Sequence, residues 1–304
     1  MSTSTSPTTG LIYGVELVCH IGGFPRSTFY SKQKASKSTP APSDPQPKPQ
    51  KRGPKTKISD TELLDLIRGD LKASPWTGEG HRKVLARLRR SHGLRVGRKR
   101  ILRIMRANGL LSPHRCRIAN DGAHEGTIIT QAPGEIWATD GTQVMTIEEG
   151  NAWIFAAVEH WNAECVGWHV AKTGNRFAAL QPLSMGIQRI YGATGQGVAR
   201  GLSLRMDHGC QYTSDDFLNQ AKHWGMAPSF ALVGQPETNG VAERFFRTLK
   251  EQAVHGRVFR NVEELRQAIG AFVNTYNTAW RLEKNGYLTP SEMRAQWNDL
   301  KLAA

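Results

Sequence analysis

Three acidic residues, Asp140, Asp207 and Glu243, lie in local sequences that suit metal-binding carboxylates. Asp140 interrupts the apolar run IWATDGTQV, where an unpaired charge is costly to bury unless it faces solvent or a cation offsets it. Asp207 follows SLRM, an expected strand end of the kind at which α/β proteins place their chemistry. Glu243 lies one turn inside an expected helix, with 35 residues between it and Asp207.

Carboxylates from three separate segments can converge only where something offsets their mutual repulsion. Mg²⁺ or Mn²⁺ with oxygen ligands is the usual solution. Two such cations suit phosphodiester chemistry, in which they activate a nucleophile and stabilise the leaving oxygen. The three carboxylates therefore indicate DNA or RNA as the substrate class.

The helix of Glu243 offers cations on the same face. Arg247 at i+4 and Lys250 at i+7 share that face, whereas Phe246 and Leu249 point toward a side that can be buried. A metal ligand followed by two phosphate-binding cations would result. The competing interpretation is an ordinary surface ion pair between Glu243 and Arg247, worth about 0.3–0.5 kcal/mol.

The net positive charge of the chain comes from its first part. The 304 residues carry a formal net charge of +14, with 40 Lys and Arg against 26 Asp and Glu. Residues 1–130 hold 24 basic and 9 acidic residues, which leaves 16 basic and 17 acidic residues for 131–304. This division suits a nucleic-acid-binding module joined to a nearly neutral domain. A merely solvated basic tail would lack apolar periodicity, and part of this region has it.

Neither a membrane span nor a disulfide framework is indicated. No stretch reaches the roughly 18 consecutive apolar residues of a membrane helix, and the start MSTSTSPTTG lacks the regions of a signal peptide. We therefore expect a cytoplasmic protein. Cys19, Cys116, Cys165 and Cys210 are scattered without the spacing of a zinc site, so they are expected to be reduced thiols.

The basic region begins with a short helical segment and a linker. Residues 1–35 indicate a helix from about Tyr13, a turn at Gly22 and Gly23, and a second short helix. This pattern suits either a helix-turn-helix or a plain helical hairpin. Residues 36–57 are rich in Pro, Ser and Lys and predict a semi-extended linker.

Residues 58–112 predict a clearer helix-turn-helix module. Apolar periodicity and capping signals predict helices that begin at Ser59 or Asp60, at His81 and at Arg98. Five basic residues of the last helix would stand on the face turned away from the core: Arg98, Lys99, Arg100, Arg103 and Arg106. A basic second helix after a short turn with Gly93 suits docking in the major groove. The alternative is a solvated helical face.

From residue 133 the apolar period changes to that of strands. Runs at 134–147, 151–161 and 164–173 are separated by expected hairpin turns. Helices and strands then alternate, with a helix at 176–191, a strand at 201–207, a helix at 214–224, an apolar run at 226–233 and a helix at 240–253. This order predicts an α/β domain with a mixed sheet and helices on both faces.

Three blocks of this region, WATDGT, RMDHGCQYTSDDF and QPETNGVAERFFRTLKEQ, resemble the catalytic blocks of the DDE transposase and retroviral-integrase superfamily. The resemblance includes the 35-residue gap and Lys250 seven positions beyond Glu243. The segments GHRKVLARLRRSHGLRVGRKRILRIMRANGL and YNTAWRLEKNGYLTPSEMRAQW resemble the integrase-type transposase that the second reading frame of a large bacterial insertion-sequence family encodes. The similarity extends from about residue 12 to 297.

The resemblance implies a ribonuclease-H-like mixed five-stranded sheet with flanking helices, preceded by all-α helix-turn-helix modules. It implies that Asp140, Asp207 and Glu243 are catalytic and hold two Mg²⁺ or Mn²⁺ ions. The loops beside the site would contain His208, Gly209, Gln211, Tyr212, Asn239 and Gly240. Lys250 would bind the DNA end, and the expected further DNA contacts are Arg244, Arg247 and the five basic residues from Arg98 to Arg106.

Six parts follow from this interpretation. They are a short helix-turn-helix-like segment at 1–35, a linker at 36–57, a helix-turn-helix DNA-binding domain at 58–112, a linker at 113–130, a ribonuclease-H-like catalytic core at 131–260 and a C-terminal helical tail at 261–304.

The implied reaction is metal-dependent DNA cleavage and strand transfer at the ends of an insertion sequence. In the family, water hydrolyses one strand at an element end, and the freed 3′ hydroxyl attacks a phosphodiester without a covalent protein intermediate. The implied partners are double-stranded DNA, as terminal inverted repeats and target, further copies of the chain in a homo-oligomer on DNA, and a candidate upstream reading-frame product. The implied location is the bacterial cytoplasm, at the nucleoid when DNA is bound.

Two departures and two other functions stay open. Cys210 replaces the usual small residue, and Trp280-Arg281-Leu282 replaces the usual Arg-Pro-His, which leaves any DNA contact of the tail undecided. A non-catalytic DNA-binding regulator of element ends is disfavoured because all three carboxylates are present. A ribonuclease-H-like nuclease for RNA or branched DNA is disfavoured by the basic helical module.

Overall fold

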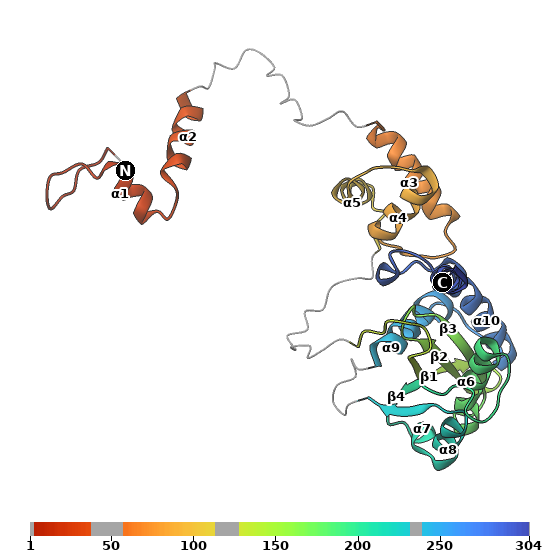
Figure 1. The fold of residues 1–304 in the computed structure, drawn as a ribbon. Coiled ribbons are helices and arrows are strands. Elements are labelled where there is room, and N and C mark those ends of the chain that lie inside the picture. The colour runs from red at the N-terminus through yellow and green to blue at the C-terminus, as the bar shows by residue number, and fades with distance from the viewer. Residues whose placement is uncertain (1–2, 38–56, 113–127, 232–238, 304) are drawn as a thin grey trace. The chain divides into compact units, whose positions relative to one another are not determined.

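The computed structural model describes residues 3–37, 57–112, 128–231 and 239–303, and Figure 1 draws the chain in sequence colours. The chain forms two compact units, residues 1–57 and 58–304. Cys116, the second of the four cysteines, lies outside the described residues. No helix of the described residues is long and apolar enough to cross a membrane.

The first unit contains two helices, α1 (Gly14–Ile21) and α2 (Arg26–Lys37). The expected turn at Gly22 and Gly23 joins them, and Gly23 adopts a φ of 65°, which glycine tolerates without a steric cost. Cys19 is the only hydrophobic residue that is fully buried in the described part of this unit. These two helices therefore enclose almost no core of their own.

The second unit begins with a three-helix module formed by α3 (Asp60–Ala73), α4 (His81–His92) and α5 (Arg98–Ala107). Ser59 caps α3 through a capping box with Glu62, in which each side chain accepts from the other residue's backbone N–H. The three helices bury one apolar cluster that includes Leu63, Ile67, Val84, Leu88, Ile101, Ile104 and Met105. The predicted helix-turn-helix module is confirmed.

A five-stranded mixed sheet forms the centre of the second unit. Its strands are β1 (Ile136–Thr146), β2 (Gly150–Glu159), β3 (Cys165–Ala171), β4 (Ser203–Met206) and β5 (Ala227–Phe230), in the order β3-β2-β1-β4-β5. The first three strands form an antiparallel meander, whereas β4 and β5 run parallel to β1. This is the ribonuclease-H-like arrangement that the sequence predicted.

Helices cover both faces of the sheet (Figure 1). On one face, α6 (Arg176–Tyr191) and α8 (Asp215–His223) pack on inward side chains such as Phe155 and Leu204. On the other face, α9 (Gly240–Leu249) and α10 (Val262–Ala279) pack on Ile154 and Val158. Successive residues of β2 thus face opposite cores, as the period-2 geometry of a strand requires.

The structure corrects two details of the expected helices. The helix predicted from Gly240 to Ala253 stops being α-helical at Leu249 and continues as one π-helical turn, Lys250–Val254. A short helix, α7 (Cys210–Thr213), precedes α8 and was not foreseen. The π turn bears on function because such turns often occur at functional sites, and this one begins at Lys250.

The C-terminal residues are built into the second unit. After α10, a 3₁₀ turn (Glu283–Asn285) leads to α11 (Pro290–Ala303). Trp76, between α3 and α4, packs edge-to-face on Phe272 and Trp280 at centroid distances of 5.9 and 5.0 Å. The Lys83 ammonium lies 2.9 Å from the centroid of a Trp280 ring. These contacts join the three-helix module to the sheet's helical layer.

Candidate active site

Strand pairing brings Asp140 and Asp207 to the same end of neighbouring strands. The parallel ladder between β1 and β4 pairs Ala138 with Arg205, and each aspartate lies two residues beyond its strand's member of that pair. Adjacent strands lie about 4.8 Å apart, so side chains at matching positions are neighbours. Asp140 is still within β1, whereas Asp207 follows the last residue of β4. Both predicted contexts are therefore confirmed.

Glu243 reaches the same region from α9. The start of this helix is tied to β1 because the Asn239 side-chain amide donates a 3.4 Å hydrogen bond to the Thr139 carbonyl oxygen, one residue before Asp140. Phe246 and Leu249 are buried, as the helical periodicity predicted, and Glu243 is on the exposed side of the helix. Three segments far apart in sequence thus approach one edge of the sheet.

The pKa of Asp140 reflects its burial beside other charged groups. It is raised from 3.8 to about 6, chiefly by burial and then by the charges of Asp207 and Glu243, while the Gly141 backbone N–H and the Lys250 ammonium act in the opposite direction. The Gly141 N–H donates to Asp140 Oδ1 at 2.7 Å. All three predicted carboxylates and Lys250 are therefore electrostatically coupled at one site.

The donor set suits a hard divalent cation, although the structure does not hold the carboxylates in a finished cage. All three side chains offer oxygen atoms, and the pKa of Asp140 is raised by burial and then by the charges of Asp207 and Glu243, a shift that a bound cation would oppose. Among the described residues, no group of three or more His, Cys, Asp or Glu is close enough together to hold a metal ion. The three carboxylates would have to draw closer around any cation that they share.

The loop after β4 supports Asp207. The Gly209 N–H donates to Asp207 Oδ1 at 2.9 Å, and a Cβ at position 209 would lie 3.0 Å from the same oxygen, so glycine permits this close approach. His208 stacks on Phe230 of β5 at a centroid distance of 5.1 Å. The loop predicted beside the site is thus held against the sheet by its own residues.

Tyr212 is buried close to Asp140 and Asp207, whose charges act on it. Its side chain is fully buried and packs edge-to-face on Phe217 of α8, with 5.3 Å between the ring centroids. Burial raises its pKa well above the ordinary value, and the charges of Asp140 and then Asp207 add to that shift. Gln211, the neighbouring predicted residue, is half-buried and approaches Gly209.

The predicted DNA-binding cations separate into two groups. On α9, Arg244 and Arg247 are exposed, and Lys250 is half-buried at the start of the π turn. On α5, Arg98, Lys99 and Arg106 are exposed. Arg100 and Arg103 instead pair with Asp60 of α3, and Arg100 also donates to the Ile58 carbonyl oxygen. The expectation that Arg100 faces away from the core is wrong, because its side chain fastens α5 to α3.

Sequence reasoning missed the basic face of α4. Five of the twelve residues in HRKVLARLRRSH are Lys or Arg, a composition that was already visible, but the apolar periodicity of this helix assigned it only to the core. Arg87 does serve the fold, since it pairs with the buried Glu79 and with Asp70. Arg82, Arg89 and Arg90 are exposed.

Comparisons with known families match this architecture in sequence. The family described as "Integrase core domain" matches twice, over residues 130–236 and 224–290, and the "HTH-like domain" family matches residues 59–117. The fold and these matches define the chain as a ribonuclease-H-like integrase-core protein with an amino-terminal helix-turn-helix module. In sequence, the chain is similar to the integrase-type DDE transposases of bacterial insertion sequences.

Curated relatives carry transposase names. "Transposase InsD for insertion element IS2A/D/F/H/I/K" of Escherichia coli is 26% identical over 201 residues, which are 64% of this chain and 65% of that protein. "Transposase InsD for insertion element IS2-9" of Escherichia coli strain K12 is also 26% identical, over 64% of each chain. The chain thus aligns with slightly less than two thirds of the length of these relatives.

Solved structures with some likeness are retroviral integrases. The catalytic core domain of BIV integrase is 22% identical and covers 56% of this chain and 99% of its own, with a TM-score of 0.40. The HTLV-2 integrase catalytic core domain in complex with magnesium is 15% identical and covers 53% of this chain and 96% of its own, with a TM-score of 0.37.

Proposed function

We propose that this chain is a metal-dependent DNA strand transferase that cuts and joins DNA at the ends of an insertion sequence. The observation that carries the proposal is the convergence of Asp140, Asp207 and Glu243 at one edge of the sheet, which follows from the β1–β4 register and the Asn239–Thr139 hydrogen bond. Three acidic groups and one cation from β1, β4, α9 and the π turn suit phosphodiester chemistry. The integrase-core matches and the transposase names of the relatives support the same reaction class.

In this proposal, Asp140, Asp207 and Glu243 are the ligands of two Mg²⁺ or Mn²⁺ ions. Such ions, when bound, activate the attacking oxygen and stabilise the leaving oxygen of an in-line displacement. The chain's own part is to hold the ligands: Gly209 positions the Asp207 carboxylate, and Asn239 anchors the helix of Glu243 beside Asp140. Water is the nucleophile for cleavage, and a DNA 3′ hydroxyl is the nucleophile for joining.

Lys250 has a positioning role in this mechanism. Its charge lowers the pKa of Asp140, so its ammonium is near the reacting edge, where it can bind a phosphate of the DNA end. Arg247 and Arg244, exposed on the preceding turns of α9, extend this cationic surface. The π turn that begins at Lys250 sets the direction in which this side chain leaves the helix.

The remaining parts of the chain fit this function as follows. The helix-turn-helix module at 58–112 binds terminal inverted repeats. The core at 131–260 carries out the chemistry on those ends and on target DNA. The tail at 261–304 packs against the module and the core. The segment at 1–35 is an accessory end-binding element, joined by the linker at 36–57, and 113–130 links module and core. We infer that the active form is a homo-oligomer on DNA, and an upstream reading-frame product is a candidate partner.

The decisive experiment is strand cleavage and joining on duplexes that carry the element's terminal repeats, with Mg²⁺ or Mn²⁺ present. Asp140→Asn, Asp207→Asn and Glu243→Gln are each expected to abolish both steps, because each removes a metal ligand without a change of volume. The matched control is Asp65→Asn, which neutralises an exposed carboxylate on α3. Full activity in Asp140→Asn would show that the proposed mechanism is wrong.

A further inference from the structure

An arginine-rich cleft lies between the three-helix module and the segment that follows α10. Its volume is about 510 Å³, and its lining includes five guanidinium groups, those of Arg82, Arg89, Arg90, Arg98 and Arg281, together with the Tyr287 side chain. They come from α4, from the first residue of α5 and from the turn between α10 and α11. Segments that are up to about 200 residues apart thus direct positive charge into one space.

We propose that this cleft binds the phosphate backbone of duplex DNA and holds the duplex that the helix-turn-helix module engages against the catalytic core. The inference rests on the proposed function, since it takes DNA as the substrate. Guanidinium groups bind phosphate oxygens in pairs of parallel hydrogen bonds, which makes Arg the preferred residue for such a site.

The lining points to the backbone rather than to the bases. Apart from arginine, the cleft is lined by Leu85, Ala86, Gly286 and Tyr287. The lining contains no Asn, Gln or carboxylate, so arginine, which can read guanine, is its only base-reading side chain, and five clustered arginines without the other base-reading types suit a row of phosphates. Phosphate contacts fix the position of a duplex without reading its sequence. The cleft is therefore expected to add affinity and register, while specificity comes from another surface.

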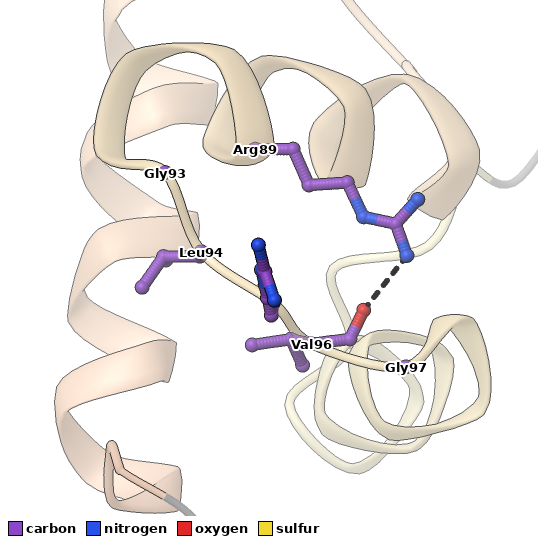
Figure 2. A pocket seen from close by; sticks show the side chains of 6 residues that line it. Arg89, Gly93, Leu94, Val96 and Gly97 are labelled. Carbon is purple, nitrogen blue, oxygen red and sulfur yellow. Dashed lines mark hydrogen bonds between the residues drawn. The ribbon is translucent and has the colours of Figure 1, made fainter.

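Two of the arginines donate hydrogen bonds to backbone carbonyl oxygens, which orders them before any ligand binds. Arg89 donates to the Val96 carbonyl oxygen at 3.0 Å, which spans the turn from α4 to α5 (Figure 2). Arg281 donates to the Tyr287 carbonyl oxygen at 2.9 Å. Tyr287 itself has a φ of 66°, an uncommon and strained value for a residue other than glycine. Such ordering lowers the entropy lost when an anion binds.

Two glutamates at the rim compete for these cations. Glu283 pairs with Arg82 at 2.6 Å, and Glu292 accepts from Arg90 at 3.1 Å and from Arg281 at 3.0 Å. No carboxylate of the described residues is within ion-pair distance of Arg89 or Arg98. The pKa of His81, at the start of α4, is lowered by burial and then by the charges of Arg82, Arg98 and Arg106. Five guanidinium groups against two carboxylates leave an excess of positive charge.

The test is the salt dependence of DNA binding by the full chain, measured by fluorescence anisotropy with an unrelated duplex and without divalent metal. The double variant Arg90→Ala/Arg281→Ala removes two cations of the cleft. If each contacts one phosphate, the slope of log affinity against log salt should become shallower by about 1.8. Binding to terminal-repeat and unrelated duplexes should weaken by the same factor.

The matched control is Arg68→Ala/Arg257→Ala, which removes two exposed charges of the same unit outside the cleft. An equal change of slope in this control, or no change in the cleft variant, would overturn the proposal. Circular dichroism melting of each variant identifies any loss of fold.

A second variant protects the test from misfolding. Glu283→Gln removes the carboxylate that occupies Arg82, so DNA should bind about two- to fivefold more tightly, a gain that an unfolded protein cannot imitate. Unchanged or weaker binding would count against the cleft. These measurements use no metal and no cleavage. A negative result would therefore contradict the DNA-binding role of the cleft without contradicting strand transfer, and a failure of strand transfer would leave the role of the cleft intact.

Discussion

The carboxylate site and the arginine cleft are two charged regions of one compact unit, and they handle their charge in opposite ways. At the sheet edge, Asp140 is buried near the charges of Asp207 and Glu243, and its pKa is raised first by burial and then by these charges. In the cleft, Arg82 and Arg281 are each partly neutralised by a glutamate. Like charges gathered at one site lower the stability of the fold until a counterion binds. Charged side chains that pair with neighbouring residues keep their positions without a ligand.

The largest expected effect separates the two regions by function. Asp207→Asn should lower the rate of strand transfer by at least about 10³-fold, because it removes one of the three carboxylates that we propose as metal ligands. DNA affinity in the absence of metal should not fall, since the variant only reduces negative charge. Single-turnover cleavage and anisotropy measure the two quantities. A variant that loses DNA binding together with catalysis would show that the regions are not independent.

The packing of the three-helix module on the core should give the next largest effect. Trp76→Ala removes an aromatic side chain that packs on both Phe272 and Trp280, so we expect a loss of about 3–5 kcal/mol in the free energy of unfolding. Urea denaturation measures it. Trp76→Phe, which keeps an aromatic ring at this position, should lose much less. A loss below about 1 kcal/mol in the alanine variant would mean that module and core are held together by other contacts.

The burial of Asp140 beside Asp207 and Glu243 predicts that a variant without this charge is more stable. Its folded pKa of about 6 exceeds the unfolded value of 3.8, so the native state binds more protons between these values, and stability falls as pH rises through that window. Above about pH 6 the cost is fully present. Asp140→Asn avoids it and should be more stable without metal by on the order of 1–2 kcal/mol at pH 8, with little gain near pH 4.

The measurement is thermal melting at several pH values in a chelating buffer. Asp65→Asn, at an exposed position on α3, should leave the pH profile unchanged. A stabilisation by Asp140→Asn that is equal at pH 4 and pH 8 would mean that the ionisation of the buried Asp140 carboxyl is not its cause.

The smallest expected effect concerns the ion pairs between α3 and α5. Asp60→Asn removes the carboxylate that pairs with Arg100 and Arg103, which should cost roughly 1 kcal/mol of stability and strengthen DNA binding about two- to threefold. Anisotropy against the same duplex measures the affinity. The Glu283→Gln variant of the cleft provides the comparison, and a decrease in affinity for Asp60→Asn would show that the paired arginines must stay fixed to α3 in order to bind.

Much of the fold follows from the sequence because its periodic signals are local. The helix predicted over 176–191 is present with those bounds, since apolar spacing and the Asn175 cap specify it without help from distant residues. The strand end at Asp207 was visible in SLRM for the same reason. The π turn at Lys250 and the inward use of Arg100 were not visible, because each depends on packing against another element.

For the candidate site, the sequence alone determined which carboxylates to consider and at what spacing, because residue types and the 35-residue gap are properties of the chain itself. It also determined that the positive charge precedes a nearly neutral core. Only the tertiary structure decided that β1 and β4 place Asp140 and Asp207 side by side, and that α4, α5 and the turn after α10 share one cleft. Strand register and helix packing are long-range choices, and no local pattern encodes the distance between residues that the fold brings together.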